Sequence, residues 1–534
     1  MEKLDARPSR ATPGNVPVFL TWSVVIFGVL LLFIGACLVV VNRALSGLIE
    51  RQLNANVEGY RFTVGQATLS PSLSLVIQRL TMIQVDHPDP PVAEIPRWVL
   101  SIQWSQIFSG VLVSDYLISR PILHITLPQA KNELQEEVPI HEKGWREGVY
   151  SFYPLKINQF KIEDADVTYV DQDASKPLHV THLNLLAGNI RNIRSPKDAY
   201  PSDLTLDGNI FDSGRIQMQG HANFLAEPYA GISADVAIQH VALEPLLPVT
   251  GRYNVQIHGG VLWAEGHLEY TAEGETHANL KRLTIENVRV DYVHTPRTTA
   301  RETQVGDAAV KTAKHLHKKP EALIQIEHGE FTNSEFGFIN EAANPPYRVF
   351  ISHGALHLEN ISNHLSEGRG VVRLTGAFMG TGDTVISGTF RPEMKSPDFD
   401  LAIKIERTKM RPMNDLLRAY GNFDVTTGLF SLYSELKVKD GHVEGYIKPL
   451  FKDMKVYDAR QDKEKSLFHQ LYEGLVGGVA HLLENRPREE VATKTDIAGA
   501  LEHPRTSTWQ TVINLVTNAF FKALLPGFEK EASR

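Results

Sequence analysis

The sequence predicts a mainly β protein: an N-terminal transmembrane helix, then an elongated, curved antiparallel β-groove built from duplicated units, with amphipathic C-terminal helices. Three observations predict the transmembrane helix, the antiparallel strands and their duplication. An uncharged apolar run lies near the N-terminus, apolar residues recur with a period of two from Tyr60 onward, and a set of glycines recurs at a constant offset. A period of two is typical of antiparallel strands with one apolar and one polar face.

The composition excludes several classes of protein. Of the 534 residues, 43% are hydrophobic and 22% are charged, which excludes a wholly disordered chain and a polytopic membrane protein. The net charge of −8 argues against a dedicated nucleic-acid-binding protein, so we expect no nucleic acid partner. The chain has one cysteine, Cys37, which excludes a disulfide framework or a cysteine-based zinc site within one copy.

Residues 16–41 are predicted to form a single transmembrane helix. The segment has 26 residues and no charge. A helix rises ~1.5 Å per residue, so this one reaches about 39 Å, enough to cross a ~30 Å hydrocarbon core. Three basic residues precede the segment and two follow it, which favours a cytoplasmic location for residues 1–15.

Two other interpretations of the apolar segment compete with a retained anchor: a cleaved signal peptide and a lipoprotein processing site. The apolar region of a cleaved signal peptide covers only ~7–15 residues, so this segment is too long. The run Ile34-Gly35-Ala36-Cys37 resembles a lipoprotein processing site, but the chain stays apolar from Leu38 to Val41. We therefore predict that the anchor is retained.

An N-terminal β region is predicted over residues 42–154, followed by strands with clear alternation. Side chains along a strand point alternately to its two faces, so every second apolar residue shares a face. If lipid covers this face, the face lines a lipid-binding groove. The predicted groove residues are Leu204, Leu206, Ile210, Ile216, Met218, Ile232, Val236, Ile238, Phe399, Leu401, Ile403 and Ile405.

An internal duplication predicts two copies of one β unit. Three glycines recur at an offset of 168 residues: Gly208, Gly214 and Gly220 return as Gly376, Gly382 and Gly388. The first repeat is predicted over residues 155–293 and the second over 322–458. Repeats that stack bury a face that neither could bury alone.

The remaining segments are predicted to be a linker and a helical end. Residues 294–321 are rich in Thr, Lys and Ala and are predicted to be a polar linker with a short helix near 307–315. Residues 459–534 are predicted to hold C-terminal helices and closing strands. Apolar residues fall at helical spacing over 467–482 and again over 508–525, where Pro526 ends the pattern.

No motif predicts enzymatic chemistry, a cofactor or a metal. The sequence has no nucleophile elbow, no phosphate-binding loop and no His-Glu-x-x-His pattern. His315 and His317 lie in the Lys-rich linker, and His353 and His357 lie in a segment predicted as strand and turn. We therefore predict that the protein is not an enzyme and has no catalytic, cofactor-binding or metal-binding residues.

The strands are too many for the helical segments available to cover them. Their apolar face must meet a second sheet, close on itself or meet a non-protein apolar partner, so a dry sandwich core and a lipid-filled groove both stay open. Ile403→Asp separates the two: a groove wall survives the change but loses lipid, whereas a dry core unfolds. Lys404→Asp, on the other face, is expected to matter little.

Several motifs resemble the AsmA-like family of bacterial envelope proteins, in the branch catalogued as a domain of unknown function. They extend over most of the chain, and those near its end are the most specific. The motifs are Leu69-Ser70-Pro71-Ser72-Leu73, the run Trp104 to Val113, Arg120-Pro121 before the strand Ile122 to Leu127, the run Tyr420 to Val425 with Gly428, Asp440-Gly441, the run Gly445 to Leu450, Asn518-Ala519-Phe520, and the run Leu524 to Phe528.

The resemblance implies a bacterial inner-membrane protein anchored through residues 16–41, with the bulk of the chain in the periplasm. It also implies a curved β-groove that binds phospholipid or another acyl lipid and supports phospholipid transport and outer-membrane integrity, with envelope proteins as partners. The alternative is a non-lipid scaffold or assembly factor for outer-membrane proteins.

Overall fold

The computed structural model divides into two compact units, which are described separately. Unit 1 comprises residues 1–122 and 136–161, and unit 2 comprises residues 123–135 and 162–534. The structure describes residues 42–102 except 43 and 71–73; 113–135; 156–190; 200–295 except 225, 227–229 and 272–274; 322–457 except 363–367, 392–397, 422–423 and 440–441; 490–492; and 495–500.

Unit 1 pairs four antiparallel strands in chain order. These are β1 (Tyr60–Leu69), β2 (Leu75–Gln84), β3 (Ala93–Ile102) and β4 (Val113–Ser119). Ile77 and Leu100 of this sheet are fully buried, and so is Ile49 on the helix that precedes β1 and comprises residues 42 and 44–56. We call this helix the edge helix, because its polar residues meet the free edge of β1.

A ladder of side-chain hydrogen bonds joins the edge helix to β1. Four polar residues spaced by four lie on one stripe of the helix and accept hydrogen bonds from backbone N–H groups of β1. The pairs are Asn42 with Leu69 (2.7 Å), Ser46 with Ala67 (2.8 Å), Glu50 with Val64 (2.9 Å) and Asn54 with Phe62 (2.8 Å). An open strand edge invites pairing with another chain, and this ladder satisfies the edge instead.

Unit 2 contains two series of elements in the same order. Strands β5 (Ile122–Thr126) and β6 (Lys156–Val170) contain residues of both units, and helix α3 (Leu127–Gln135) follows β5. The first series begins with β6 and continues with β7 (Leu178–Ile190), β8 (Ser202–Ile210), β9 (Gly214–Asn223), β10 (Gly231–Ala242), the helical turns η2 (Glu244–Leu246), α5 (Leu247–Thr250) and η3 (Gly251–Tyr253), β11 (Val255–Tyr270) and β12 (Thr276–His294).

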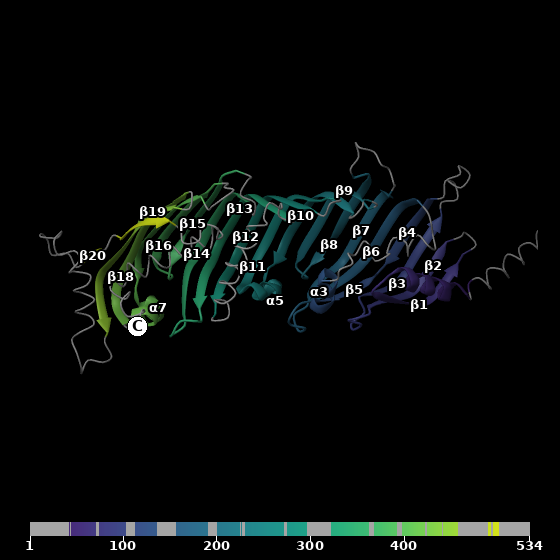
Figure 1. Cartoon of the computed structure of the whole chain (residues 1–534), viewed down its shortest axis with the longest axis horizontal. Coiled ribbons are helices and arrows are strands. Elements are labelled where there is room, and N and C mark those ends of the chain that lie inside the picture. The colour runs from purple at the N-terminus through teal and green to yellow at the C-terminus, as the bar shows by residue number, and fades with distance from the viewer. Residues whose placement is uncertain are drawn as a thin grey trace, which may run out of the picture. The chain divides into compact units, whose positions relative to one another are not determined.

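The second series repeats this order about 168 residues later. It comprises β13 (Ala322–Asn340), β14 (Tyr347–Ser362), β15 (Gly370–Phe378), β16 (Gly382–Phe390), β17 (Phe399–Lys409), the helical segments η4 (Arg411–Met413) and α7 (Asn414–Gly421), β18 (Asp424–Lys439) and β19 (His442–Tyr457). Two short strands, β20 (Glu490–Ala492) and β21 (Thr495–Ala500), pair with β19. Figure 1 shows the unit 2 strands following one another in chain order.

The sheet of unit 2 is mixed: most of its strands are antiparallel as predicted, and it departs from the predicted antiparallel groove at one place. Strands β7 to β12 and β13 to β19 pair antiparallel, but β12 and β13 are parallel. Each series has seven strands, and an odd number leaves the last strand running in the direction of the first. A second series that starts in the same direction therefore meets the first in parallel, and the chain between His294 and Ala322 supplies the crossover that such a pair requires.

A line of β-bulges crosses the sheet of unit 2. The register shifts between Ile238 and Val241, and the intervening His240 has a left-handed backbone with φ of 54°. Comparable left-handed residues lie at Asn333 and Arg407, beside shifts in β13 and β17. Each bulge bends its strand and increases the local twist, so the line curves the sheet toward one face.

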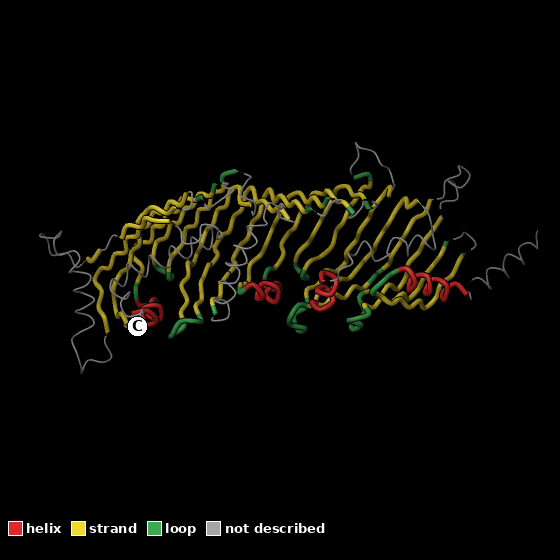
Figure 2. The backbone as a smooth tube through the Cα atoms, viewed as in Figure 1, coloured by secondary structure: helices red, strands yellow, loops and turns green. Residues whose placement is uncertain are grey.

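Helical segments lie at one end of the unit 2 strands. Figure 1 labels α5 and α7 at the same end of the strands, and Figure 2 draws them in red. Within the part of the chain that the structure describes, no helix combines the length and apolar character needed to cross a membrane. The predicted span 16–41, the linker helix 307–315 and the C-terminal helices over 467–482 and 508–525 lie outside the described residues.

Candidate binding face

The eight predicted groove residues of the first repeat lie on one face of three neighbouring strands. Leu206 of β8 lies opposite Met218 of β9, which lies opposite Val236 of β10. Directly paired residues point to the same side of a sheet, so each cross-strand row is a row of one face. The other five follow from the same registers: Leu204, Ile210, Ile216, Ile232 and Ile238.

The same face continues across the remaining strands to the predicted residues of β17. Cross-strand partners connect Val241 of β10 to Ile447 of β19 in one continuous row. The connecting partners are Leu262, Ile285, Phe331, Leu356, Leu374, Ile386, Ile403 and Ser434. All but Ser434 are apolar, and we call this side of unit 2 the apolar face.

The two ends of the apolar face differ in exposure. Of the predicted residues in β8 to β10, only Leu204 is buried, and the other seven are half-buried. In β17, Phe399 is 0% exposed and Ile403 is 8% exposed, and both belong to one large cluster of buried side chains. At β17 the apolar face is therefore a dry protein core, which favours the core alternative for Ile403.

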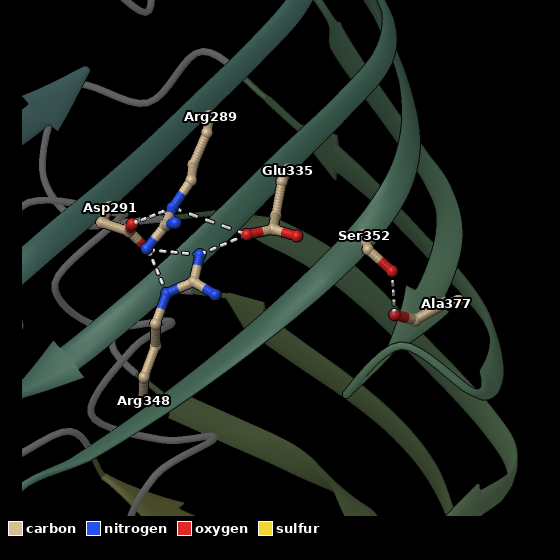
Figure 3. Close-up of polar contacts among 6 residues, drawn as sticks. All are labelled: Arg289, Asp291, Glu335, Arg348, Ser352 and Ala377. Atoms are coloured by element: carbon tan, nitrogen blue, oxygen red, sulfur yellow. Dashed lines mark hydrogen bonds and ion pairs between the residues drawn. The ribbon is translucent and has the colours of Figure 1, made fainter. Parts of the chain in front are cut away.

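A buried ion cluster lies on the opposite face, where the two series meet (Figure 3). Asp291 of β12 has a fully buried carboxylate, and Arg348 of β14 approaches it to 2.7 Å. Arg348 also lies 2.6 Å from Glu335 of β13, and Arg289 lies 2.8 Å from Asp291. Gly337 leaves room for the Asp291 and Arg348 side chains, because a Cβ at this position would overlap both of them.

The charges of this cluster are held by their mutual pairing. Burial opposes the charge on Arg348, but hydrogen bonds to Asp291 and Glu335 outweigh that effect and raise its pKa. A buried carboxylate is tolerated only when it is paired and hydrogen-bonded, and Asp291 has both arginines for this purpose. The cluster therefore ties β12 to β13 and β14 across the parallel junction.

Three side chains on the polar face are linked by hydrogen bonds in the order Ser–His–Asp, as in the catalytic triad of a serine hydrolase. His267 Nε2 lies 3.1 Å from Ser233 Oγ, and His267 Nδ1 lies 2.9 Å from Asp235. The hydrogen bond from His267 lowers the pKa of Asp235. However, β10 is paired with β9 and β11 on both sides, so its amides are not available to stabilise an oxyanion. With Asp235 74% exposed, the arrangement is a surface hydrogen-bond chain.

The histidine pair that sequence spacing singled out does not converge. His353 and His357 both lie in β14, where a rise of ~3.3 Å per residue separates them by about 13 Å. His357 lies 4.0 Å from Glu330 on the neighbouring strand. Among the described residues, no group of three or more metal-ligating side chains lies together. His315 and His317 lie outside them.

The sequence prediction missed the part of the apolar face that joins its two ends. Phe331 and Leu356 lie beside bulges, and Ile285 lies two residues before Asn287, whose backbone is left-handed, so the alternation of apolar and polar residues is interrupted there. Two residues that share a face on either side of a bulge are three positions apart rather than two, as Ile238 and Val241 are. A search for strict alternation therefore stops at each bulge.

Comparison of the sequence with models of protein families finds no match, and comparison with curated proteins finds none either.

Proposed function

We propose that the apolar face of unit 2 binds the acyl chains of phospholipid, and that the protein supports phospholipid transport and outer-membrane integrity in a bacterial envelope. The supporting observation is the half-buried stretch of aliphatic side chains over β8 to β10, on one side of a sheet whose other side is polar. Partly exposed aliphatic side chains gathered on one face are expected at a binding site for an apolar partner.

The envelope location and the AsmA-like membership belong to the same proposal. They are supported by the motifs near Tyr420 and Gly445 and by the uncharged segment 16–41, which would anchor the chain in the inner membrane. The bulk of the chain then lies in the periplasm, where envelope proteins are its expected partners. We propose binding and transfer rather than catalysis, because the triad-like side chains lie on the polar face, away from the apolar face.

The test is photo-crosslinking in living cells from the middle of the apolar face. A photoreactive amino acid is placed at Met218 or Val236, and at Gln217 or Asp235 as controls on the opposite face. We expect phospholipid, identified by mass spectrometry, on the first two positions only. Crosslinks to protein alone at Met218 and Val236 would replace this proposal with the scaffold alternative.

A further inference from the structure

We propose that α7 is a plug that closes the C-terminal part of the apolar face, so that lipid reaches only the part formed by the first series of strands. This inference rests on the proposed lipid-binding function and defines the extent of its site. It follows from a difference between two helical segments that occupy equivalent places in the two series.

The helical segments after β10 and after β17 differ in burial. In the first, η2, α5 and η3 contain no buried residue, and Tyr253 at their end is 68% exposed. In the second, Met413, Leu416 and Leu417 are 1% to 4% exposed. Only the second segment is inserted into a core.

The position of α7 shows that the sheet curves around it. The helix contacts both β14 and β18, which are separated in the sheet by β15, β16 and β17. Four strand spacings of ~4.8 Å would place β14 and β18 about 19 Å apart in a flat sheet, whereas a helix is only ~10 Å wide. The helix therefore fills the concave side that these strands form.

Side chains from the surrounding strands complete the closure. Phe430 of β18 is 0% exposed, and its ring lies 6.5 Å from that of Phe378 of β15. Tyr347 of β14 belongs to the same buried cluster as Leu416 and Leu417 of α7. In the first series, the buried cluster beside α5 has only three members: Leu243, Ile285 and Val288.

Polar contacts fasten α7 at both ends. The side chain of Asn414 accepts a hydrogen bond from the Val425 amide (2.9 Å) and donates one to the Val425 carbonyl (3.1 Å). Arg418 pairs with Asp424 at 2.8 Å and is 46% exposed. These contacts join the helix to the start of β18 without entering the apolar core, so they can be removed while the core side chains stay unchanged.

Thiol labelling tests the plug without any lipid. Cys37, the single native cysteine, is replaced by alanine in the full chain, and Met218→Cys or Ile403→Cys is added. We expect a soluble maleimide to label position 218 at least about tenfold faster than position 403, because a buried thiol reacts only through local opening. The double change Asn414→Ala and Arg418→Ala should speed labelling at 403 severalfold and leave 218 unchanged. Equal rates at the two positions in the parent chain would overturn the plug.

Photo-crosslinking from the same two positions then separates the plug from the proposed function. Lipid captured at 218 but not at 403, and at both after the double change, is the expected result. Lipid captured equally at both positions in the parent chain overturns the plug and leaves the lipid function standing. Lipid absent from 218, with unequal thiol rates, overturns the lipid function and leaves α7 as a closure of the sheet.

Discussion

Individual charged residues differ widely in what they contribute, and burial decides the difference. Asp291 has a carboxylate that is 0% exposed between two arginines, whereas Asp383 and Arg407 form an ion pair in which both side chains are about 70% exposed. Desolvation makes an unpaired buried charge costly, while solvent screens an exposed pair.

Asp291→Ala is expected to destabilise unit 2 by about 1.5–3 kcal/mol, because it removes the charged hydrogen-bond partner that Arg348 and Arg289 share and leaves them Glu335 alone. Urea unfolding followed by circular dichroism measures the change. Asp383→Ala is the matched control and is expected to cost at most about 1 kcal/mol. Equal effects of the two changes would contradict the assigned role of the buried cluster.

His182 is expected to titrate above its ordinary range. Its Nδ1 lies 2.6 Å from Asp164, and this hydrogen bond raises the pKa of His182. A raised pKa in the folded state adds stability that is fully present below the pKa of the unfolded chain and is lost as the pH rises through the folded value. Proton NMR titration of the imidazole measures the pKa, and Asp164→Asn should return it toward the ordinary value. A pKa unaffected by that change would exclude the pair as the cause.

At the scale of elements, the edge helix completes the hydrogen bonding of β1. The helix supplies acceptors at every fourth residue, and the edge of β1 that faces the helix presents N–H groups at roughly every second residue. Four helical residues rise ~6 Å and two strand residues rise ~6.6 Å, so the two repeats stay in step over four contacts. This match explains why Asn42, Ser46, Glu50 and Asn54 lie on a single stripe.

Glu50→Ala is expected to destabilise unit 1 by about 1–3 kcal/mol, because the Val64 amide then lacks an acceptor. The opened edge should also allow strands of two copies to pair, which light scattering after size-exclusion chromatography would detect. Glu50→Gln keeps an acceptor oxygen and should stay close to the parent protein. Gln52→Ala, at an exposed position of the same helix, should have no effect on either measurement.

At the scale of unit 2, one continuous face performs two physical roles. Over β8 to β10 its aliphatic residues are half-buried, and over β17 to β19 they form a closed core around α7. The same kind of substitution should therefore have opposite consequences at the two ends.

Met218→Asp is expected to leave the melting temperature within a few degrees of the parent and to abolish lipid crosslinking, since a half-buried carboxylate keeps contact with water. Ile403→Asp is expected to unfold unit 2, because it places a charge in a dry core at a cost of several kcal/mol. Gln217→Asp and Lys404→Asp, on the polar face, are the controls. A folded Ile403→Asp protein would show that the core at β17 admits water.

The sequence by itself determined the mainly β class, the duplication of elements at a spacing near 168 and the set of residues that share a face. These features depend on local alternation and on turns, which neighbouring residues decide. The tertiary structure alone decided the parallel junction between β12 and β13, the side-chain ladder on β1 and the closure by α7. It also decided that Ile403 is core while Met218 is half-buried, although both belong to similar alternating patterns. Each of these depends on which distant segments come together, and a period of two specifies the face of a side chain but not what covers that face.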